Sequence, residues 1–251
     1  MQKTIALLSV LFLVGQACEG YQQISGRLVL KGALPKQQIV QISRNTEHFG
    51  LTRPDESLLI NPHNKGIANV VVWAILSDPQ LFKVPETVAF RVQKGRVIPR
   101  VTTMNWRQHL KLDIPTTPHL YSIKVIGSSL TSDQLMGFLP VGPVYEWHFE
   151  ENSSFLQPIH CVLNPWLGGY VILLDHNYSD VSNCDGKFTM SHIPKSTEST
   201  IKLKMWHEEF GWIQQVKING RTHKLHRGIL EISRQQDLGE MQLRLRKNYR
   251  P

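Results

Sequence analysis

The segment Trp206-His207-Glu208-Glu209 places a histidine beside two carboxylates, a pairing that could act as a base with an orienting acid. The segment lies at the end of an alternating apolar and charged run. Neighbouring side chains of a strand point to opposite faces, so His207 and Glu208 would not face one another. We therefore expect Trp206 to pack in the core, with His207 and Glu208 at the end of a strand.

Two other segments contain histidines that could bind a metal or act as a base, but a purely structural role explains each of them. Asp175-His176 follows an apolar strand and leads into a turn, and His223 and His226 flank Lys224 in a basic segment after Asn219-Gly220. Two histidines three residues apart could bind a metal on a helix, but this segment follows the strongest short hairpin signal. We expect a solvated basic loop or strand there.

Motifs for nucleophilic, phosphate or dinucleotide chemistry are missing from the sequence. There is no Gly-x-Ser-x-Gly elbow, P-loop, dinucleotide fingerprint or His-Glu-x-x-His pair. The sequence therefore predicts a protein that is not an enzyme.

Strand signals dominate the 251 residues, and helical periodicity is scarce. We expect no helix longer than a turn or two, and loops at 77–87 and 105–118. Many short strands at about ten-residue spacing predict a sandwich or barrel. The expected strands are 24–30, 67–76, 88–92, 97–101, 120–126, 145–149, 170–174, 188–190, 200–206, 213–218, 228–232 and 240–245.

A second, fainter pattern is similar to regulatory-type sandwich modules, of the carboxypeptidase regulatory or Cna-B kind. Gly26-Arg27-Leu28-Val29 opens it, and Asp185-Gly186-Lys187-Phe188 with Pro194 follows much later. If strands from 21–86 complete such a module with 179–251, residues 87–178 are a second sandwich inserted into the first.

From residue 24 to about residue 243, the chain resembles secreted bacterial cupredoxin-like proteins of the methylamine-utilisation-like family. The resemblance is carried by several segments together: 54–61 (PDESLLIN), 64–72 (NKGIANVVV), 161–167 (CVLNPWL), 175–178 (DHNY), 185–188 (DGKF) and 206–208 (WHE). It implies an all-β fold with a cupredoxin-like Greek-key β-sandwich and an added regulatory-module-like portion. It also implies a cupredoxin-like sandwich at 21–178 and the regulatory-module-like portion at 179–251.

The resemblance also implies a copper loop of the form Cys-x-x-His-Pro-Trp-Met. Cysteine and histidine bind copper in such loops, and the methionine is a weak axial ligand. This chain keeps Cys161, Pro165 and Trp166 but has Asn164 in place of the histidine and Leu167 in place of the methionine. Loss of the equatorial histidine predicts a vestigial site, with Cys161 a small buried residue and copper not bound.

The second copper histidine of the family comes from an earlier strand. His109 is the candidate here, although it lacks the preceding acidic residue and stands two residues closer than in the family, and His119 is a fallback. His160 directly precedes Cys161, so its side chain should point to the opposite face of the strand. We expect the vestigial metal site to be His109 with Cys161. A copper-binding electron-transfer protein with an altered ligand set is the alternative.

The first twenty residues predict a secretory signal peptide. Lys3 precedes an apolar run from Ile5 to Val14, and small residues surround Cys18. The run is shorter than the about 20 residues that span a bilayer, and no other segment approaches that length. We expect an exported protein, periplasmic or extracellular, without stable membrane insertion unless a lipid is attached at Cys18. Cys161 and Cys184 then remain, and a disulfide between them is open.

The net charge of +8 does not by itself identify the class of partner that the protein binds. Part of it lies near the C-terminus, at Arg244, Arg246, Lys247 and Arg250, where a basic strand and tail explain it as well as an anionic partner does. No aromatic-rich basic groove accompanies it, so we expect no nucleic acid. The sequence thus predicts a non-catalytic binding or structural protein with an unknown extracytoplasmic partner and unknown oligomeric state.

Overall fold

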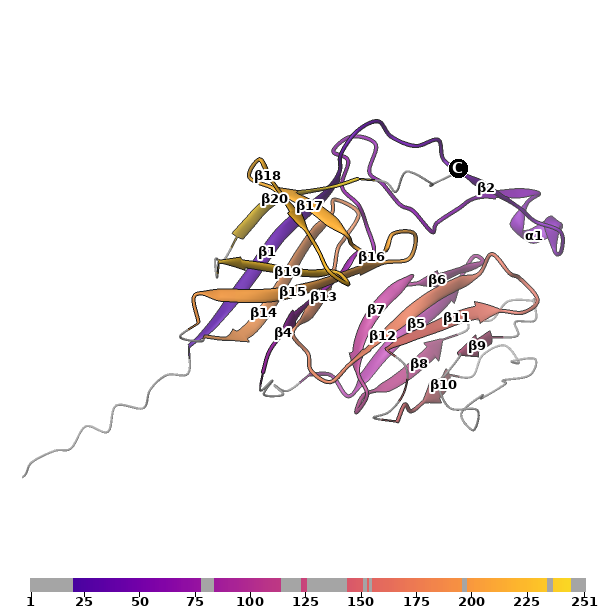
Figure 1. Cartoon of the computed structure of the whole chain (residues 1–251). Helices are drawn as coiled ribbons and strands as arrows, with labels where there is room; N and C mark the ends of the chain where they lie inside the picture. The colour runs from indigo at the N-terminus through magenta and orange to yellow at the C-terminus, as the bar shows by residue number, and fades with distance from the viewer. Residues whose placement is uncertain are drawn as a thin grey trace, which may run out of the picture.

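The chain is an all-β protein in the computed structural model (Figure 1), which confirms the predicted fold class. The structure describes residues 20–77, 84–113, 123–125, 144–150, 153, 155–195, 198–233 and 237–244. The predicted signal peptide and Cys18, together with His119, lie outside these residues. Within the described part, no helix is long and apolar enough to cross a membrane.

The first of two sandwiches, here called the terminal sandwich, draws on both ends of the described chain. One sheet has the order β14-β1-β20-β17-β18; the other is β13-β4-β15-β16, with β19 also paired to β15. The strands are β1 Tyr21–Leu30, β4 Val71–Ile75, β13 Ser179–Val181, β14 Lys187–Pro194, β15 Thr200–His207, β16 Gly211–Trp212, β17 Gln215–Ile218, β18 Arg221–Lys224, β19 Ile229–Ser233 and β20 Asp237–Leu243. The strands β1 and β4 thus share their sheets with strands from residues 179–243, while a domain boundary at 178/179 stays a prediction.

The second sandwich, here called the inserted sandwich, lies between β4 and β13 in the sequence. Its sheets have the orders β10-β8-β5-β6 and β7-β12-β11-β9. The pairs β5–β8 and β7–β12 are parallel, so the chain crosses over between these strands and does not follow simple hairpins. The strands are β5 Thr87–Gln93, β6 Arg96–Ile98, β7 Val101–Asn105, β8 His109–Asp113, β9 Ile123–Val125, β10 Val144–Trp147, β11 Leu156–Cys161 and β12 Gly168–Leu174.

Each sandwich has its own core, and β4 explains why its sequence is apolar without a break. Val70, Val72 and Ala74 lie in the core of the terminal sandwich. Val71 and Trp73, on the other face, pack against Ile172 and Leu174 of the inserted sandwich. A strand that is covered on both faces needs apolar residues at every position, because alternate side chains point to opposite faces.

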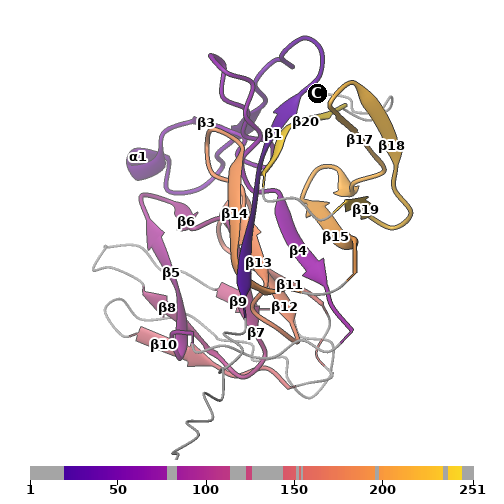
Figure 2. The same cartoon turned by 90° about the vertical axis from the view of Figure 1, so that its left-hand side faces the viewer.

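The two sandwiches meet through this shared cluster and a buried ion pair. Trp206 packs on Tyr170 with 5.3 Å between ring centroids. The Arg100 guanidinium donates two hydrogen bonds of 2.7 Å to the Glu208 carboxylate, and both side chains are largely buried. The sandwiches lie side by side in Figure 1 and Figure 2, and they are joined by apolar packing, this bidentate pair and a 2.9 Å hydrogen bond from Ser179 Oγ to Thr103 Oγ1.

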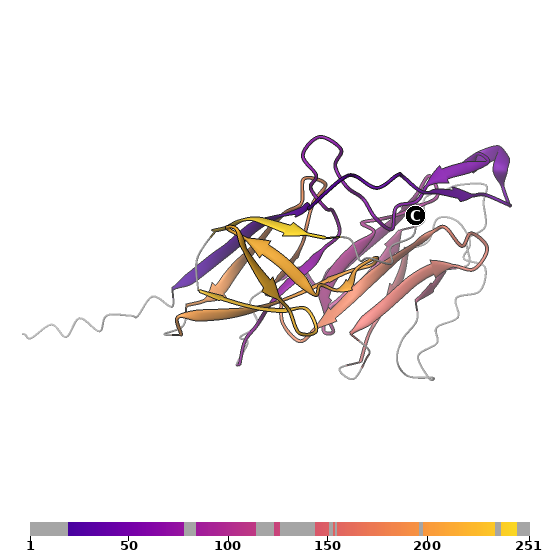
Figure 3. The same cartoon turned by 45° about the horizontal axis from the view of Figure 1, so that its top comes forward.

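A long excursion of the chain between β1 and β4, here called the arm (residues 32–62), reaches from the terminal sandwich to the inserted one. It holds the two-stranded ribbon of β2 (Ile39–Gln41) and β3 (Thr52–Pro54), with the four-residue helix α1 (Thr46–Phe49) between them. Figure 3 shows the ribbon over one end of the inserted sandwich. An isolated two-stranded hairpin is only marginally stable in water, so its contacts with that end hold it in place.

The structure agrees with most expected strands, adds β2, β3, β11 and β13 to them, and corrects a predicted loop. The helix α1 has a single turn, as expected, and Val70, Val72, Trp73, Ile172 and Leu174 are buried as predicted. The predicted loop at 105–118 is wrong in part, because β8 forms at His109–Asp113. Apolar and polar residues alternate over only five positions of β8, which is too short a pattern to distinguish a strand from a polar loop. Leu110 and Leu112 supply the buried face of this strand.

Candidate functional site

The loop from Cys161 to Leu167 connects β11 to β12 and is the segment with the copper-loop resemblance. It is closed by backbone hydrogen bonds: Cys161 N–H donates to the Leu167 carbonyl at 3.0 Å, and Leu167 N–H donates to the Asn164 carbonyl at 2.8 Å. The side chains of Cys161 and Leu167 both lie in the core of the inserted sandwich. The hydrocarbon side chain of Leu167 therefore occupies the position where the resemblance expects the thioether of a methionine.

Asn164 is the polar residue inside this loop, and its side chain is fully buried. Its Nδ2 lies 3.7 Å from Cys161 Sγ and donates a weak hydrogen bond to the sulfur. Its Oδ1 has no hydrogen-bond partner among the described residues. A buried carbonyl without a partner costs free energy, so this amide is not explained by stability alone.

His109 lies away from Cys161. On β8, Leu110 and Leu112 point into the cluster that contains Cys161, so His109 points to the opposite face of the sheet. There its ring contacts His148, with 4.0 Å between centroids, and its Nδ1 is 3.7 Å from a carboxylate oxygen of Glu146. Lys111 also binds Glu146, at 3.0 Å, and that hydrogen bond holds the pKa of the carboxyl below its usual value.

The other histidines near the loop in sequence are placed elsewhere. His160 is half-buried and alternates with the buried Ile159 and Cys161, so it points away from the core as expected. His176 accepts the N–H of Tyr178 on its Nδ1 at 3.2 Å, and burial lowers its pKa. It follows β12 at the start of a turn, as the sequence predicted.

These donor atoms do not fit a copper centre of the blue type. That centre needs a thiolate and two imidazoles directed at one point. Cys161 has an amide and a leucine as loop neighbours, while His109 and His160 point away from it. Among the described residues, no group of three or more histidine, cysteine, aspartate or glutamate side chains could hold a metal ion.

The arm covers the end of the inserted sandwich at which this loop lies. The Phe49 ring meets the Trp166 ring edge-on at 5.8 Å, and Arg53 donates a 2.7 Å hydrogen bond to the Lys94 carbonyl. Glu56 pairs with Arg96 in the same region. Trp166, predicted to be largely buried, is partly buried, and the arm supplies part of its cover.

His207 and Glu208 form no catalytic pair. His207 Nδ1 accepts the Glu209 N–H at 3.1 Å, so Nε2 carries the proton and donates to the Ala68 carbonyl at 3.2 Å. Burial lowers the His207 pKa to about 3, so the ring is neutral and structural. Burial also raises the pKa of Glu208, and the hydrogen bonds from Arg100 act in the opposite direction.

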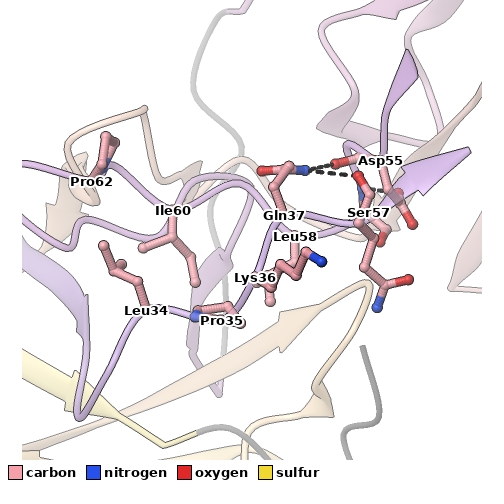
Figure 4. Close-up of a pocket in the computed structure, with 10 residues that line it drawn as sticks. Leu34, Pro35, Lys36, Gln37, Asp55, Ser57, Leu58, Ile60 and Pro62 are labelled. Atoms are coloured by element: carbon pink, nitrogen blue, oxygen red, sulfur yellow. Dashed lines mark hydrogen bonds between the residues drawn. The ribbon is translucent and has the colours of Figure 1, made fainter. Parts of the chain in front are cut away.

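A cavity of about 230 Å³ opens at the base of the arm (Figure 4). Leu34, Ile60 and Pro62 lie at one end of it, and the Gln37 amide donates a 2.7 Å hydrogen bond to the Asp55 carbonyl at the other. Its volume is below the roughly 300–1,000 Å³ of most small-molecule sites. No sequence pattern predicts this cavity, because its walls come from two extended segments that carry no motif.

Comparison with known protein families gives no match, and no curated protein matches the chain. Among solved structures, a Cu-containing nitrite reductase from Thermus scotoductus SA-01 is 14% identical, with a TM-score of 0.30; the match covers 41% of this chain and 25% of the enzyme. A reduced Cu(I) form of an amicyanin mutant at pH 4 is 10% identical, with a TM-score of 0.30, and covers 41% of this chain and 98% of its own. A second amicyanin mutant in the Cu(I) state is 13% identical, with a TM-score of 0.31, and also covers 41% and 98%. These similarities are too low to carry an argument about metal or activity.

Proposed function

We propose that the protein is a non-catalytic binding or structural protein whose copper-type loop lacks the histidine and methionine ligands. The observation that carries the proposal is the packing of residues 161–167. Asn164 and Leu167 stand where the resemblance expects histidine and methionine, and both side chains are buried. The thiol of Cys161 lies among apolar side chains and one amide.

The arm supports the same proposal from outside the loop. A carrier that exchanges electrons brings its metal close to a partner's surface. Here Phe49, Arg53 and Glu56 bind the end of the inserted sandwich that holds the loop. A partner could approach Trp166 from that side only after the arm had moved.

The test is a copper(II) titration of the mature protein, with metal analysis and visible absorption. We expect a colourless protein that binds copper weakly, because among the described residues the candidate imidazoles of His109 and His160 point away from Cys161. The double variant Asn164→His with Leu167→Met restores the Cys-x-x-His-x-x-Met loop and should bind copper more tightly. Leu167→Met alone is the matched control, since a weak axial ligand cannot replace the equatorial histidine.

An intense copper–thiolate band in the unmodified protein would contradict the proposal. An electron-transfer protein with an altered ligand set would then be the better description, and His160 would be the first replacement ligand to test.

We also propose that the protein is exported. The proposal rests on Lys3, the apolar run from Ile5 to Val14 and the small residues that follow. N-terminal sequencing of the protein from its natural compartment should give a start between Cys18 and Gln22. A mature chain that begins at Met1 would contradict export.

A further inference from the structure

Three cationic side chains line up across one end of the terminal sandwich. Leu30 of β1 pairs with Leu243 of β20, so Lys31 and Arg244, each one residue further, lie beside one another. The Lys31 N–H donates to the Leu243 carbonyl at 2.6 Å, which holds this register past the end of the strand. On the other side of β20, Lys217 pairs with Gln242 in antiparallel register. Extended by two residues past the end of β20, this register places Gln215 opposite Arg244.

Gln215 in turn pairs with Lys224 of the edge strand β18. Lys31, Arg244, Gln215 and Lys224 therefore form one line that crosses four strands at right angles to their direction. Leu30, Leu243 and Val216 point into the core, so this line lies on the outer face of the sheet. We call Lys31, Arg244 and Lys224 the basic row; Lys217 lies two residues from Gln215 on the same face.

The charge of the basic row is not balanced within the described part of the chain. None of Lys31, Lys217, Lys224 and Arg244 has an ion pair there. Glu240, an acidic residue on the same face of β20, lies 3.7 Å from Arg27 and is paired with it. Repulsion from Arg244, and then from Lys217, lowers the pKa of Lys31. A bound anion would relieve that repulsion.

The shape of the basic row indicates the shape of its ligand. Neighbouring strands are about 4.8 Å apart, so the row is about 14 Å long across its four strands and only one residue wide. A linear polyanion can place successive charges along such a line. Val29, Gln242 and Thr222 occupy the next positions of these strands, and none is an aromatic platform on which bases could stack.

We propose that the basic row binds an acidic polysaccharide laid across the strands of the terminal sandwich. Successive sulfate or carboxylate groups of the polymer would contact Lys31, Arg244 and Lys224, with Gln215 as a neutral hydrogen-bonding position between them. The proposal names a ligand class for the binding protein proposed above and rests on that function. It uses different residues from the copper loop, so failure of either test is distinguishable from failure of the other.

The experiment measures binding of the full mature chain to heparin, as a sulfated probe, and to alginate, as a carboxylate probe, over a range of salt concentrations. The test variant carries Lys31→Gln, Lys224→Gln and Arg244→Gln. The control variant carries Arg107→Gln, Lys187→Gln and Lys202→Gln, which removes the same charge from exposed positions elsewhere. Thermal unfolding of each variant establishes that it is folded.

We expect the test variant to bind at least about tenfold more weakly, with a salt slope lower by about 2–3, because each cation lost removes one charge contact. The control variant should bind like the unmodified protein. The two probes distinguish sulfate from carboxylate as the preferred group. Equal losses in both variants would show that net charge alone attracts the polymer and would overturn the proposal. So would tighter binding to anionic lipid vesicles or duplex DNA than to either polysaccharide, or no binding to the probes at low salt.

Discussion

Two tight turns, one in each sandwich, differ in how their polar side chains are bonded. At the turn between β13 and β14, Asp185 Oδ1 accepts the side-chain amides of Asn61 at 2.9 Å and Asn64 at 2.7 Å. The Asp185 carbonyl accepts Arg27 Nε at 3.0 Å. At the turn between β11 and β12, the Asn164 amide is buried with its oxygen unpaired among the described residues.

This difference in hydrogen bonding distinguishes polar residues that stabilise the fold from a polar residue that does not. Asn61, Asn64 and Asp185 stand in segments that carry the family resemblance, and their hydrogen bonds hold the end of the arm and the residues that follow it to the turn at Asp185. Asn164 has no comparable task, because its bond to sulfur is weak and its oxygen is unsatisfied. A residue without a stabilising role stands where the resemblance expects a ligand, which agrees with the proposal made above for residues 161–167.

The largest expected effect tests the polar group that is buried deepest in the terminal sandwich. His207 has its pKa lowered by burial to about 3, against about 6.5 in the unfolded chain. Between these values the unfolded state binds more protons, so stability falls as the pH falls from about 6.5 to about 3 and then levels off. At about 1.4 kcal/mol per pH unit, the loss approaches about 4–5 kcal/mol.

Urea unfolding at a series of pH values measures this loss. In the variant His207→Gln, the free energy of unfolding should be lower at pH 7 and should depend less on pH. The exposed His226→Gln is the control and should keep the slope of the unmodified protein. An unchanged slope in His207→Gln would show that other groups cause the acid sensitivity.

The second effect tests how tightly the turn at Asp185 is packed. Gly186 has a φ of +76°, and a Cβ there would overlap the backbone carbonyl of Leu28. Positive φ costs a residue with a side chain about 1–2 kcal/mol and overpacking adds about 1–3, so Gly186→Ala should lose about 2–5 kcal/mol. Gly220 has a φ of +79° but open space around it, so Gly220→Ala should lose only the first part.

Chemical denaturation of the two glycine variants gives the comparison directly. Equal losses would mean that the backbone around Gly186 moves aside at little cost, and the turn would not be the rigid element described here.

The smallest effect concerns Asn164 and has the opposite sign. Replacing it with leucine, which is close in size, removes the unpaired carbonyl from the core of the inserted sandwich. We expect Asn164→Leu to gain about 1 kcal/mol, because an unsatisfied buried polar group costs about 1–3 kcal/mol. Asn64→Leu, which breaks the bond to Asp185, should lose about 1 kcal/mol or more by the same measure. A loss of that size in Asn164→Leu would contradict the view that Asn164 has no stabilising task.

Much of the fold could be predicted from the sequence because strand periodicity and turn signals are local patterns. Alternation marked β15, the Asn219-Gly220 pair marked the hairpin of β17 and β18, and the unbroken apolar run marked β4 as a strand covered on both faces. The opposite directions of His160 and Cys161 followed from the same period of two. That Asn164 and Leu167 differ from the histidine and methionine that the resemblance expects could also be read directly from the chain.

Only the tertiary structure shows which residues far apart in the sequence contact one another. No local pattern joins Arg100 to Glu208, which are 108 residues apart, or brings Phe49 of the arm to Trp166. His109 was a copper candidate by its residue type, and the buried leucines on either side of Lys111 in β8 placed it on the outer face. The basic row likewise depends on pairing across four strands. The sequence determines the type of each residue, but sheet register and packing determine which residues far apart in the sequence become neighbours.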